Sequence, residues 1–288
     1  MRLCTFRTAG GPPEGWPGRL DEDRIIRLDA PDLISVLAGR GQVADGAARP
    51  AAPAAVPAAE AELLAPVPRP PSVRDFFAFE QHIATARANR GAEVPVEWYE
   101  FPAFYFTNPA AVYGPGAEIS YPAGTAMLDY ELEVAAVIGA DGQIGGFTIM
   151  NDWSARDIQR KEMRVGLGPA KAKDFATSLG PVLVTPDEFD GTQAVMTARV
   201  NGEERSRGDL ADLHYSWPDI LAQATRNTVL RPGDIIGSGT VGTGCILEHD
   251  DGRWLVPGDT VELEVAGLGV LRNRIGPPRR PQARAGGR

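Results

Sequence analysis

The segment LDYELEVAAVIG carries acids at every second position, which is the pattern in this chain with the clearest chemical consequence. If the segment is a β-strand, Asp129, Glu131 and Glu133 point to one side, with neighbours about 6.5–7 Å apart. At an effective dielectric constant of 20, two such carboxylates repel each other by roughly 2.4 kcal/mol. Water would screen this repulsion, so a solvated strand face and a cation-binding face both explain the pattern.

A second group of polar residues occurs in GGFTIMNDWSARDIQ, where an apolar strand is predicted to end and a helix to begin near Asp152. Asp152 as a simple helix cap explains this acid completely. Arg156 and Gln159 follow it at spacings of four and seven residues, so a helix starting there would place both above Asp152. The convergence of an acid, a cation and an amide favours a site, and a solvated helix face is the other explanation.

A further acid, Asp75, lies seven residues before His82, which is about two turns if that segment is helical. A histidine can act as a general base near neutral pH, but a buried structural histidine explains His82 equally. The chain has three histidines, and Cys4 and Cys245 are far apart, so a zinc site rich in nitrogen or sulfur is not expected. Carboxylates instead favour a hard divalent ion such as magnesium, manganese or calcium.

The elements that must position these residues are mainly short strands. Apolar segments bounded by glycine or proline predict strands over ELEVAAVIG, GGFTIMN, GPVLVTP, AVMTARVNG, DIIGSGTVG and TVELEVAGLGVLRN. Helices are predicted over DFFAFEQHIATARANR, DWSARDIQRKEM and DLHYSWPDILAQATRN, with a short one in DAPDLISVLAGRG. Many short strands with few helices predict a β-rich α+β fold and not a doubly wound sheet.

Composition divides the chain into four parts. Residues 1–45 form a small N-terminal region, and the Ala/Pro-rich residues 46–71 are predicted to be a surface linker. Residues 72–275 read as one continuous domain. Residues 276–288 are basic and rich in glycine and proline, so we expect a disordered tail.

The charge balance and the cysteine content limit the classes of partner. The 288 residues carry a formal net charge of -9, which argues against a general nucleic-acid binder but not against an anionic substrate. No apolar run approaches the roughly 20 residues that span a bilayer, and MRLCTFRTAGG lacks the apolar core of a signal peptide. We therefore expect a cytoplasmic protein with two reduced thiols and no membrane partner.

Six segments together resemble the fumarylacetoacetate hydrolase (FAH) superfamily: DFFAFEQH, LDYELEVA, MNDWSARDIQ, the AKDF of residues 172–175, GSGTVGTG and GLGVLRN. They occur in the family's order between Leu63 and Ile275, so the domain over 72–275 is identified as FAH-like and catalytic. The resemblance implies a mixed β-sandwich roll with a few short helices, often found as a homodimer. It also implies a divalent metal ion, Mg²⁺ before Mn²⁺ or Ca²⁺, with the ligands Asp75, Glu131, Glu133 and Asp152.

The resemblance implies catalytic roles for five further residues. His82 stands at the position of the family's catalytic histidine, and Glu248 resembles the glutamate that orients it. Lys173, Arg156 and Gln159 match positions that contribute cationic and amide donors. The resemblance therefore implies a general base together with donors for a developing oxyanion.

Other matching positions concern the substrate and the surroundings of the metal. Thr240 resembles a substrate-binding position, and Lys173 and Thr177 resemble positions close to the metal. Phe77 and Met163 occupy places where fumarylacetoacetate-cleaving members carry tyrosines. The loss of two hydroxyls removes hydrogen bonds that would select that substrate, so the resemblance implies a changed substrate pocket.

These assignments predict a metal-dependent hydrolase that cleaves a carbon–carbon bond in an acylpyruvate-like or other β-dicarbonyl (2,4-dioxo) acid. His82 would activate water to attack the carbonyl, and an enolate would leave with its oxygen held by the cation. A lyase, isomerase, hydratase or decarboxylase acting on a related 2-oxo acid is the alternative, because such enzymes need no water activated by a His–Glu pair. A non-catalytic small-molecule-binding protein is the minor alternative, and it predicts erosion of the acids.

Overall fold

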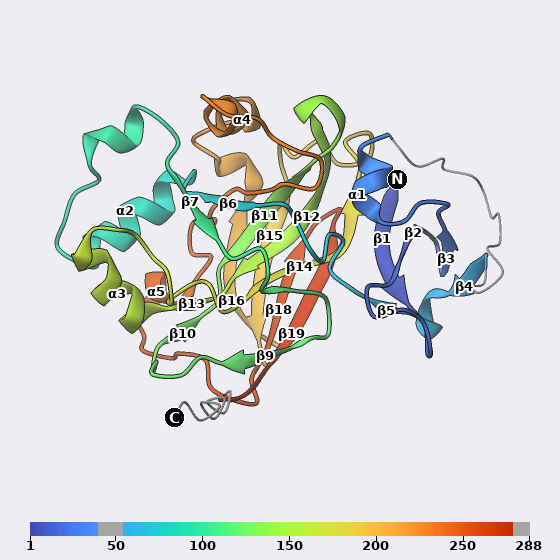
Figure 1. Cartoon of the computed structure of the whole chain (residues 1–288). Helices are drawn as coiled ribbons and strands as arrows, with labels where there is room; N and C mark the ends of the chain where they lie inside the picture. The colour runs from blue at the N-terminus through green and yellow to red at the C-terminus, as the bar shows by residue number, and fades with distance from the viewer. Residues whose placement is uncertain (40–53, 279–288) are drawn as a thin grey trace, which may run out of the picture.

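The computed structural model describes residues 1–39 and 54–278, and within these ranges nearly all of the strands belong to two β-sheets (Figure 1). The larger sheet contains β1 (Arg2–Arg7), β2 (Trp16–Asp21), β3 (Arg24–Arg27), β4 (Ala55–Pro57), β5 (Glu62–Leu63), β6 (Val73–Phe76), β7 (Phe104–Thr107), β8 (Val112–Tyr113), β11 (Leu132–Ile138), β12 (Ile144–Asp152), β14 (Thr177–Val184) and β17 (Ile235–Gly237). The smaller sheet contains β9 (Glu118–Tyr121), β15 (Val195–Val200), β16 (Glu203–Asp209), β18 (Thr260–Val265) and β19 (Gly269–Pro278). A separate ribbon pairs β10 (Leu128–Asp129) with β13 (Ser154–Ala155).

The main path of the larger sheet runs β4-β3-β2-β1-β14-β12-β11-β17-β6-β7, and the smaller sheet runs β16-β15-β18-β19-β9. The described helices are α1 (Leu33–Leu37), α2 (Glu80–Ala88), α3 (Arg156–Val165), α4 (Trp217–Thr225) and α5 (Ile246–His249), with 3-10 turns η1 (Ala58–Glu60), η2 (Val96–Tyr99), η3 (Ala140–Gly142) and η4 (Leu210–Asp212). Figure 1 shows α2, α3 and α5 grouped on the side of the larger sheet opposite β1–β5. This mixed α+β fold with few helices is the predicted class. Among the described residues, no helix has the length and apolar character needed to cross a membrane.

The central strand β11 is buried on both faces, and its two faces pack into different clusters. Leu132, Val134 and Ala136 belong to the main core, which also contains residues of the smaller sheet such as Leu263. Ala135 and Val137 belong to a second cluster on the opposite face. Because side chains alternate along a strand, Glu133 points to the second face, at the end where α2 and α3 lie.

Two helix starts predicted from the sequence are wrong. Asp75 lies in β6, and α2 begins only at Glu80, because residues 73–76 pair with β17 and β7 instead. Strand β12 continues through Asp152, and α3 begins at Arg156, so Asp152 is a strand residue and not a helix cap. The single strand predicted over LDYELEVAAVIG is interrupted after Asp129, where the chain passes from the ribbon to β11.

The described part of the predicted linker belongs to the larger sheet. Strand β4 pairs with β3, and β5 pairs with β1. The N-terminal region is joined to the same sheet because β1 pairs with β14. Strand β19 extends to Pro278, three residues past the predicted domain end, because it pairs with β9. Residues 40–53, which include part of the predicted linker, and residues 279–288 of the predicted tail lie outside the described residues.

Candidate functional site

The register of the larger sheet brings acids from separate parts of the chain to one place. Asp75 on β6 pairs with Gly237 on β17 and with Tyr105 on β7, and β17 pairs with β11, which carries Glu133. A Cβ atom at Gly237 would lie 2.5 Å from Oδ1 of Asp75 and 3.0 Å from Oε2 of Glu133. Only glycine at this position leaves room for both carboxylates.

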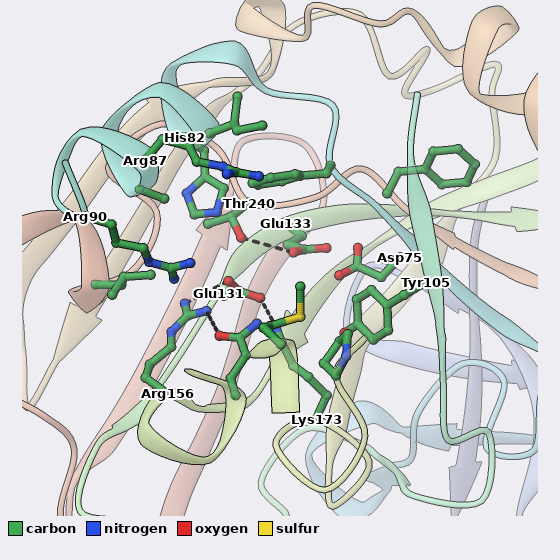
Figure 2. A pocket seen from close by; sticks show the side chains of 18 residues that line it. Asp75, His82, Arg87, Arg90, Tyr105, Glu131, Glu133, Arg156, Lys173 and Thr240 are labelled. Carbon is green, nitrogen blue, oxygen red and sulfur yellow. Dashed lines mark hydrogen bonds and ion pairs between the residues drawn. The ribbon is translucent and has the colours of Figure 1, made fainter. Parts of the chain in front are cut away.

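Asp75, Glu131 and Glu133 form a buried acid cluster, with one carboxylate oxygen of each within 4.8 Å of the others (Figure 2). Their exposed fractions are 4%, 4% and 0%, which excludes a solvated strand face. Asp75 Oδ1, Glu133 Oε2 and Asp152 Oδ1 are buried without a hydrogen-bond partner. Unpartnered carboxylate oxygens are ligands that a hard divalent ion prefers, so these residues fit such an ion.

The cluster contains two kinds of acid. Burial and the neighbouring Asp152 raise the pKa of Asp75 well above its ordinary value, and burial together with Asp75 does the same for Glu133. Burial also acts to raise the pKa of Glu131, but Arg156 and Lys173 outweigh it and lower that pKa. Two cations therefore compensate Glu131, whereas no cation outweighs burial and like-charge repulsion at Asp75 and Glu133.

We predict that Mg²⁺ stabilises this protein more at pH 7 than at pH 4. Folding raises the pKa of both Asp75 and Glu133. Each carboxyl group therefore stabilises the folded state at a pH below its pKa in the unfolded chain, 3.8 for Asp75 and 4.5 for Glu133, and this stabilisation is lost as the pH rises. An ion that binds the deprotonated acids reverses the loss, by about 2.7 kcal/mol at a hundredfold excess over Kd. Urea unfolding in Mg²⁺ and in chelator, from pH 4 to pH 7, measures how much Mg²⁺ raises the free energy of unfolding at each pH. An Mg²⁺ effect that becomes smaller as the pH rises would contradict the prediction.

Two cations approach the acids from α3 and the turn that follows it. Lys173 Nζ donates to Oε2 of Glu131 and Oδ2 of Asp152, and the Tyr105 hydroxyl donates to the same oxygen of Asp152. Arg156 Nη2 donates to Oε1 of Glu131 at 2.7 Å, and Nη1 donates to Gln159 Oε1 at 3.2 Å. Burial opposes the charge on Lys173, yet Asp152 and Glu131 raise its pKa, so the ammonium stays protonated.

A carboxylate on α3 holds the turn that carries Lys173. Glu162, near the end of α3, accepts hydrogen bonds from the backbone N–H groups of Ala170, Lys171 and Ala172, at 2.8, 2.8 and 3.2 Å. These bonds tie the turn to α3. They thereby position the Lys173 side chain over the acids.

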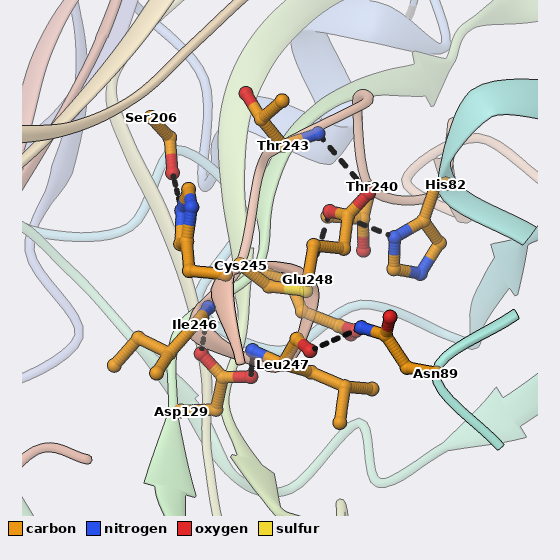
Figure 3. A network of polar contacts seen from close by, with 12 residues as sticks. His82, Asn89, Asp129, Ser206, Thr240, Thr243, Cys245, Ile246, Leu247 and Glu248 are labelled. Carbon is orange, nitrogen blue, oxygen red and sulfur yellow. Dashed lines mark hydrogen bonds and ion pairs between the residues drawn. The ribbon is translucent and has the colours of Figure 1, made fainter. Parts of the chain in front are cut away.

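His82 on α2 and Glu248 on α5 form a dyad beside the acid cluster (Figure 3). His82 Nδ1 lies 3.0 Å from Oε2 of Glu248, although an N–H on Nδ1 is not aligned with that oxygen, so the contact is an ion-pair contact and not a well-formed hydrogen bond. The other oxygen of Glu248 accepts the Thr243 N–H at 3.1 Å, and Thr243 adopts a left-handed φ of 66° to present it. The Phe77 ring packs edge-on against His82 at 5.2 Å.

Asp129 links the dyad to the cationic side of the site and is not part of the acid cluster. Its carboxylate accepts the backbone N–H groups of Ile246 and Leu247, at 2.7 and 3.1 Å, at the start of α5. It also accepts from Arg156 Nε at 2.7 Å. One buried acid therefore fixes both the helix that carries Glu248 and the guanidinium that holds Glu131.

Replacing Asp129 by alanine is expected to lower the free energy of unfolding by about 3–5 kcal/mol, because Arg156 would lose one buried partner and α5 its anchor. Denaturant unfolding with a circular dichroism readout measures this. Glu203→Ala, which removes an exposed partner of Arg253, serves as control and should change stability by less than about 1 kcal/mol. Equal effects of the two substitutions would contradict the anchoring role.

The site residues converge on a pocket of about 210 Å³. Ten of the residues predicted from the sequence line it: Asp75, Phe77, His82, Glu131, Glu133, Arg156, Gln159, Met163, Lys173 and Thr240. Thr240 donates to Oε1 of Glu133 at 3.3 Å, and Met163 is half-exposed at the rim. Asp152 and Glu248 do not line the pocket themselves. Each contacts a residue that does, Lys173 for Asp152 and His82 for Glu248. Thr177 pairs with Asp152 across β12 and β14 and is buried, and it does not line the pocket.

Three functional candidates were missed by the sequence analysis. Arg87 and Arg90 line the pocket, and neither pairs with an acid among the described residues. A signal for Arg90 existed, because His82, Ala86 and Arg90 recur at the four-residue spacing of one helix face. Tyr105 gave no such signal, since only the pairing of β6 with β7 places it opposite Asp75.

Comparisons with known proteins agree with this architecture. Residues 72–276 match the family described as "Fumarylacetoacetate (FAA) hydrolase C-terminal". Oxaloacetate tautomerase YisK of Bacillus subtilis (strain 168) is 31% identical over 232 residues, which cover 75% of this chain and 74% of that protein. A 5-carboxymethyl-2-hydroxymuconate delta-isomerase from Mycobacterium smegmatis superposes with a TM-score of 0.75 at 26% identity, covering 96% of this chain and 100% of that one. The fumarylacetoacetate hydrolase of Exiguobacterium antarcticum superposes with a TM-score of 0.77 at 26% identity, covering 97% and 100%. The chain therefore belongs to the fumarylacetoacetate hydrolase family.

Proposed function

We propose that this enzyme is a metal-dependent tautomerase or isomerase of a small 2-oxo diacid, with the keto–enol interconversion of oxaloacetate as the first reaction to test. The observation that carries the proposal is the position of His82. One of its ring nitrogens lies within 4.8 Å of a carboxylate oxygen of Glu131, so a base stands next to the acid cluster that fits a divalent ion. The names of two relatives, a tautomerase and an isomerase, describe proton-transfer reactions of this kind.

The chain supplies what a proton transfer needs. Asp75, Glu131, Glu133 and Asp152 would hold a divalent ion, which we propose to be Mg²⁺, and when bound it would polarise the oxygens of a 2-oxo acid and make the adjacent C–H more acidic. His82 takes the proton from carbon and delivers it to the enolate oxygen, the reverse transfer restores the keto form, and Glu248 stabilises the protonated imidazole in between. Lys173 and Arg156 hold positive charge beside the oxygen on which negative charge develops.

Arg87 and Arg90 support a substrate with two carboxylates. Burial, together with the nearby Arg156, Arg160 and Arg87, lowers the pKa of Arg90, which means that these cations repel each other. A carboxylate of the ligand would relieve that repulsion and form charge-assisted hydrogen bonds. A pocket of about 210 Å³ suits a short diacid better than a long acyl chain.

Hydrolysis of a carbon–carbon bond in an acylpyruvate-like acid is the second candidate, and the His82–Glu248 dyad favours it. A histidine paired with a carboxylate can also take a proton from water, and one solved relative is a fumarylacetoacetate hydrolase. The same side chains serve both reactions. The difference lies in whether a water molecule or a C–H bond of the ligand faces His82.

Product analysis separates the two candidates. The protein is incubated with oxaloacetate and with a panel of acylpyruvates in Mg²⁺, in Mn²⁺ and in chelator, and the acids are resolved by chromatography. The proposal predicts metal-dependent equilibration of tautomers or double-bond isomers without loss of carbon skeleton. Two shorter acids from an acylpyruvate would establish the hydrolase instead. The predicted homodimer is tested on the same sample by light scattering, which reports the mass in solution.

A further inference from the structure

Cys245 lies beside the dyad, and the proposed reaction gives it no role. It is fully buried at the N-cap of α5, and its Sγ donates to Oε2 of Glu248 at 3.4 Å (Figure 3). The same oxygen lies 3.0 Å from Nδ1 of His82. A thiol, an imidazole and a carboxylate therefore meet at one point on the wall of the site.

Glu131 brings a further carboxylate close to His82 and Cys245. A ring nitrogen of His82, Sγ of Cys245 and a carboxylate oxygen of Glu131 all lie within 4.8 Å of one another. All three residues are buried, and His82 Nδ1 has no aligned hydrogen-bond partner. These donors differ in kind from Asp75 and Glu133, because they include sulfur and nitrogen. Such a set suits a borderline ion such as zinc rather than magnesium.

The spacing of the donors is close to that of a bound ion. Zinc binds sulfur at about 2.3 Å and nitrogen or oxygen at about 2.0–2.2 Å in tetrahedral geometry, which places neighbouring ligand atoms about 3–4 Å apart. The 3.0 Å and 3.4 Å contacts around Oε2 of Glu248 fall in this range. The pocket that His82 and Glu131 line provides the entrance for an ion.

We propose that His82, Cys245 and Glu248, with Glu131 as an adjacent donor, form a second metal site that takes a thiophilic divalent ion such as Zn²⁺. On binding, the sulfur–hydrogen bond of Cys245 breaks, a zinc–sulfur bond forms, and the proton leaves to solvent. A thiolate, one carboxylate and a neutral imidazole then balance the charge of the ion. Occupation of this site removes His82 and Glu248 from catalysis, so Zn²⁺ inhibits the enzyme; this consequence rests on the proposed function.

Cobalt(II) is the probe that reports the sulfur ligand directly. The full chain is first given excess Mg²⁺, which supplies the acid cluster with a hard ion, and Co²⁺ is then titrated. A cobalt–thiolate bond gives a charge-transfer band in the near ultraviolet, which oxygen ligands do not produce. We expect this band to saturate at one Co²⁺ per chain and to be absent in Cys245→Ser.

Cys4→Ser is the matched control, because Cys4 is equally buried but lies on β1 in the main core. The band should persist in this variant. A missing band in the unaltered protein, or a band that survives Cys245→Ser, would overturn the proposal. Circular dichroism of each variant shows whether the fold is kept.

Zn²⁺ binding by calorimetry keeps the proposal testable if Cys245→Ser fails to fold. His82→Ala and Glu248→Gln both retain the thiol. Removing a residue that only supports a metal ligand already lowers metal affinity by about tenfold or more, so each variant should weaken Zn²⁺ binding by at least about tenfold. Unchanged affinity in both variants would overturn the site. Zn²⁺ binding that leaves turnover intact would support the site and contradict the proposed role of His82, so the two ideas fail separately.

Discussion

Replacing His82 by alanine should lower kcat by about 10²–10⁴-fold, the usual contribution of a positioned general base, while leaving Mg²⁺ binding unchanged. His82 lines the pocket beside Glu131, and its ring is held between Glu248 and the Phe77 ring. Its removal takes away the group that moves the proton but leaves Asp75, Glu133 and Asp152 in place. Steady-state kinetics together with Mg²⁺ calorimetry measures the two quantities.

Two comparison variants sharpen this result. Glu248→Gln should lower kcat less than His82→Ala, because the imidazole remains but loses the carboxylate that stabilises its protonated form. His214→Ala should leave kcat within about twofold of the unaltered enzyme, since His214 packs among Trp98, Tyr99 and Tyr215 and does not line the pocket. Unchanged turnover in His82→Ala with intact Mg²⁺ binding would sink both the tautomerase and the hydrolase mechanisms.

Substitutions of two neighbouring acids should change stability in opposite directions. Glu133→Gln should raise the free energy of unfolding of the metal-free protein by about 1–3 kcal/mol at pH 7, because it removes repulsion with Asp75. Glu131→Gln should lower it by about 3–5 kcal/mol, because it leaves Arg156 and Lys173 buried without their shared partner. Both variants should lose metal-dependent turnover, since each loses a proposed metal ligand.

Urea unfolding in chelator, followed by the same measurement in Mg²⁺, checks this pair. Mg²⁺ should raise the free energy of unfolding of the unaltered protein more than that of Glu133→Gln. Glutamine has the size of glutamate, but its neutral amide is a weaker metal ligand. If Glu133→Gln destabilised the metal-free protein as strongly as Glu131→Gln, the acid cluster would be a satisfied structural network and not a cation site.

Part of the fold follows directly from the sequence. Strands β11 and β12 were predicted because both are continuous apolar segments bounded by glycine, but their antiparallel pairing was not. The strands of residues 54–63 were not predicted, because their Ala/Pro-rich composition is typical of a linker and their pairing depends on the edges of β3 and β1. Asp75 was assigned to a helix because a short apolar run such as DFFAF fits either element, and only the distant β17 decides for a strand.

The candidate site was also predictable in part. The acids were recognisable because Glu131 and Glu133 lie two residues apart and Asp152 follows an apolar strand. Their ligand roles, and the pairing of His82 with Glu248, came from the family resemblance, because no local pattern connects residues 166 positions apart. The anchoring contacts of Asp129 and Glu162 could not be predicted, since they depend on backbone N–H groups whose positions only the folded chain defines.

We propose that this site moves a proton on a metal-held 2-oxo diacid, and the ketonisation of enol-oxaloacetate is the reaction in which that transfer can be followed. The absorbance of the enol is followed in Mg²⁺ with the unaltered enzyme, with His82→Ala, and with the unaltered enzyme in chelator. We expect fast decay only in the first sample, with oxaloacetate recovered intact as the keto form. Decay at the uncatalysed rate in all three samples, alongside metal-dependent cleavage of an acylpyruvate into two acids, would contradict it.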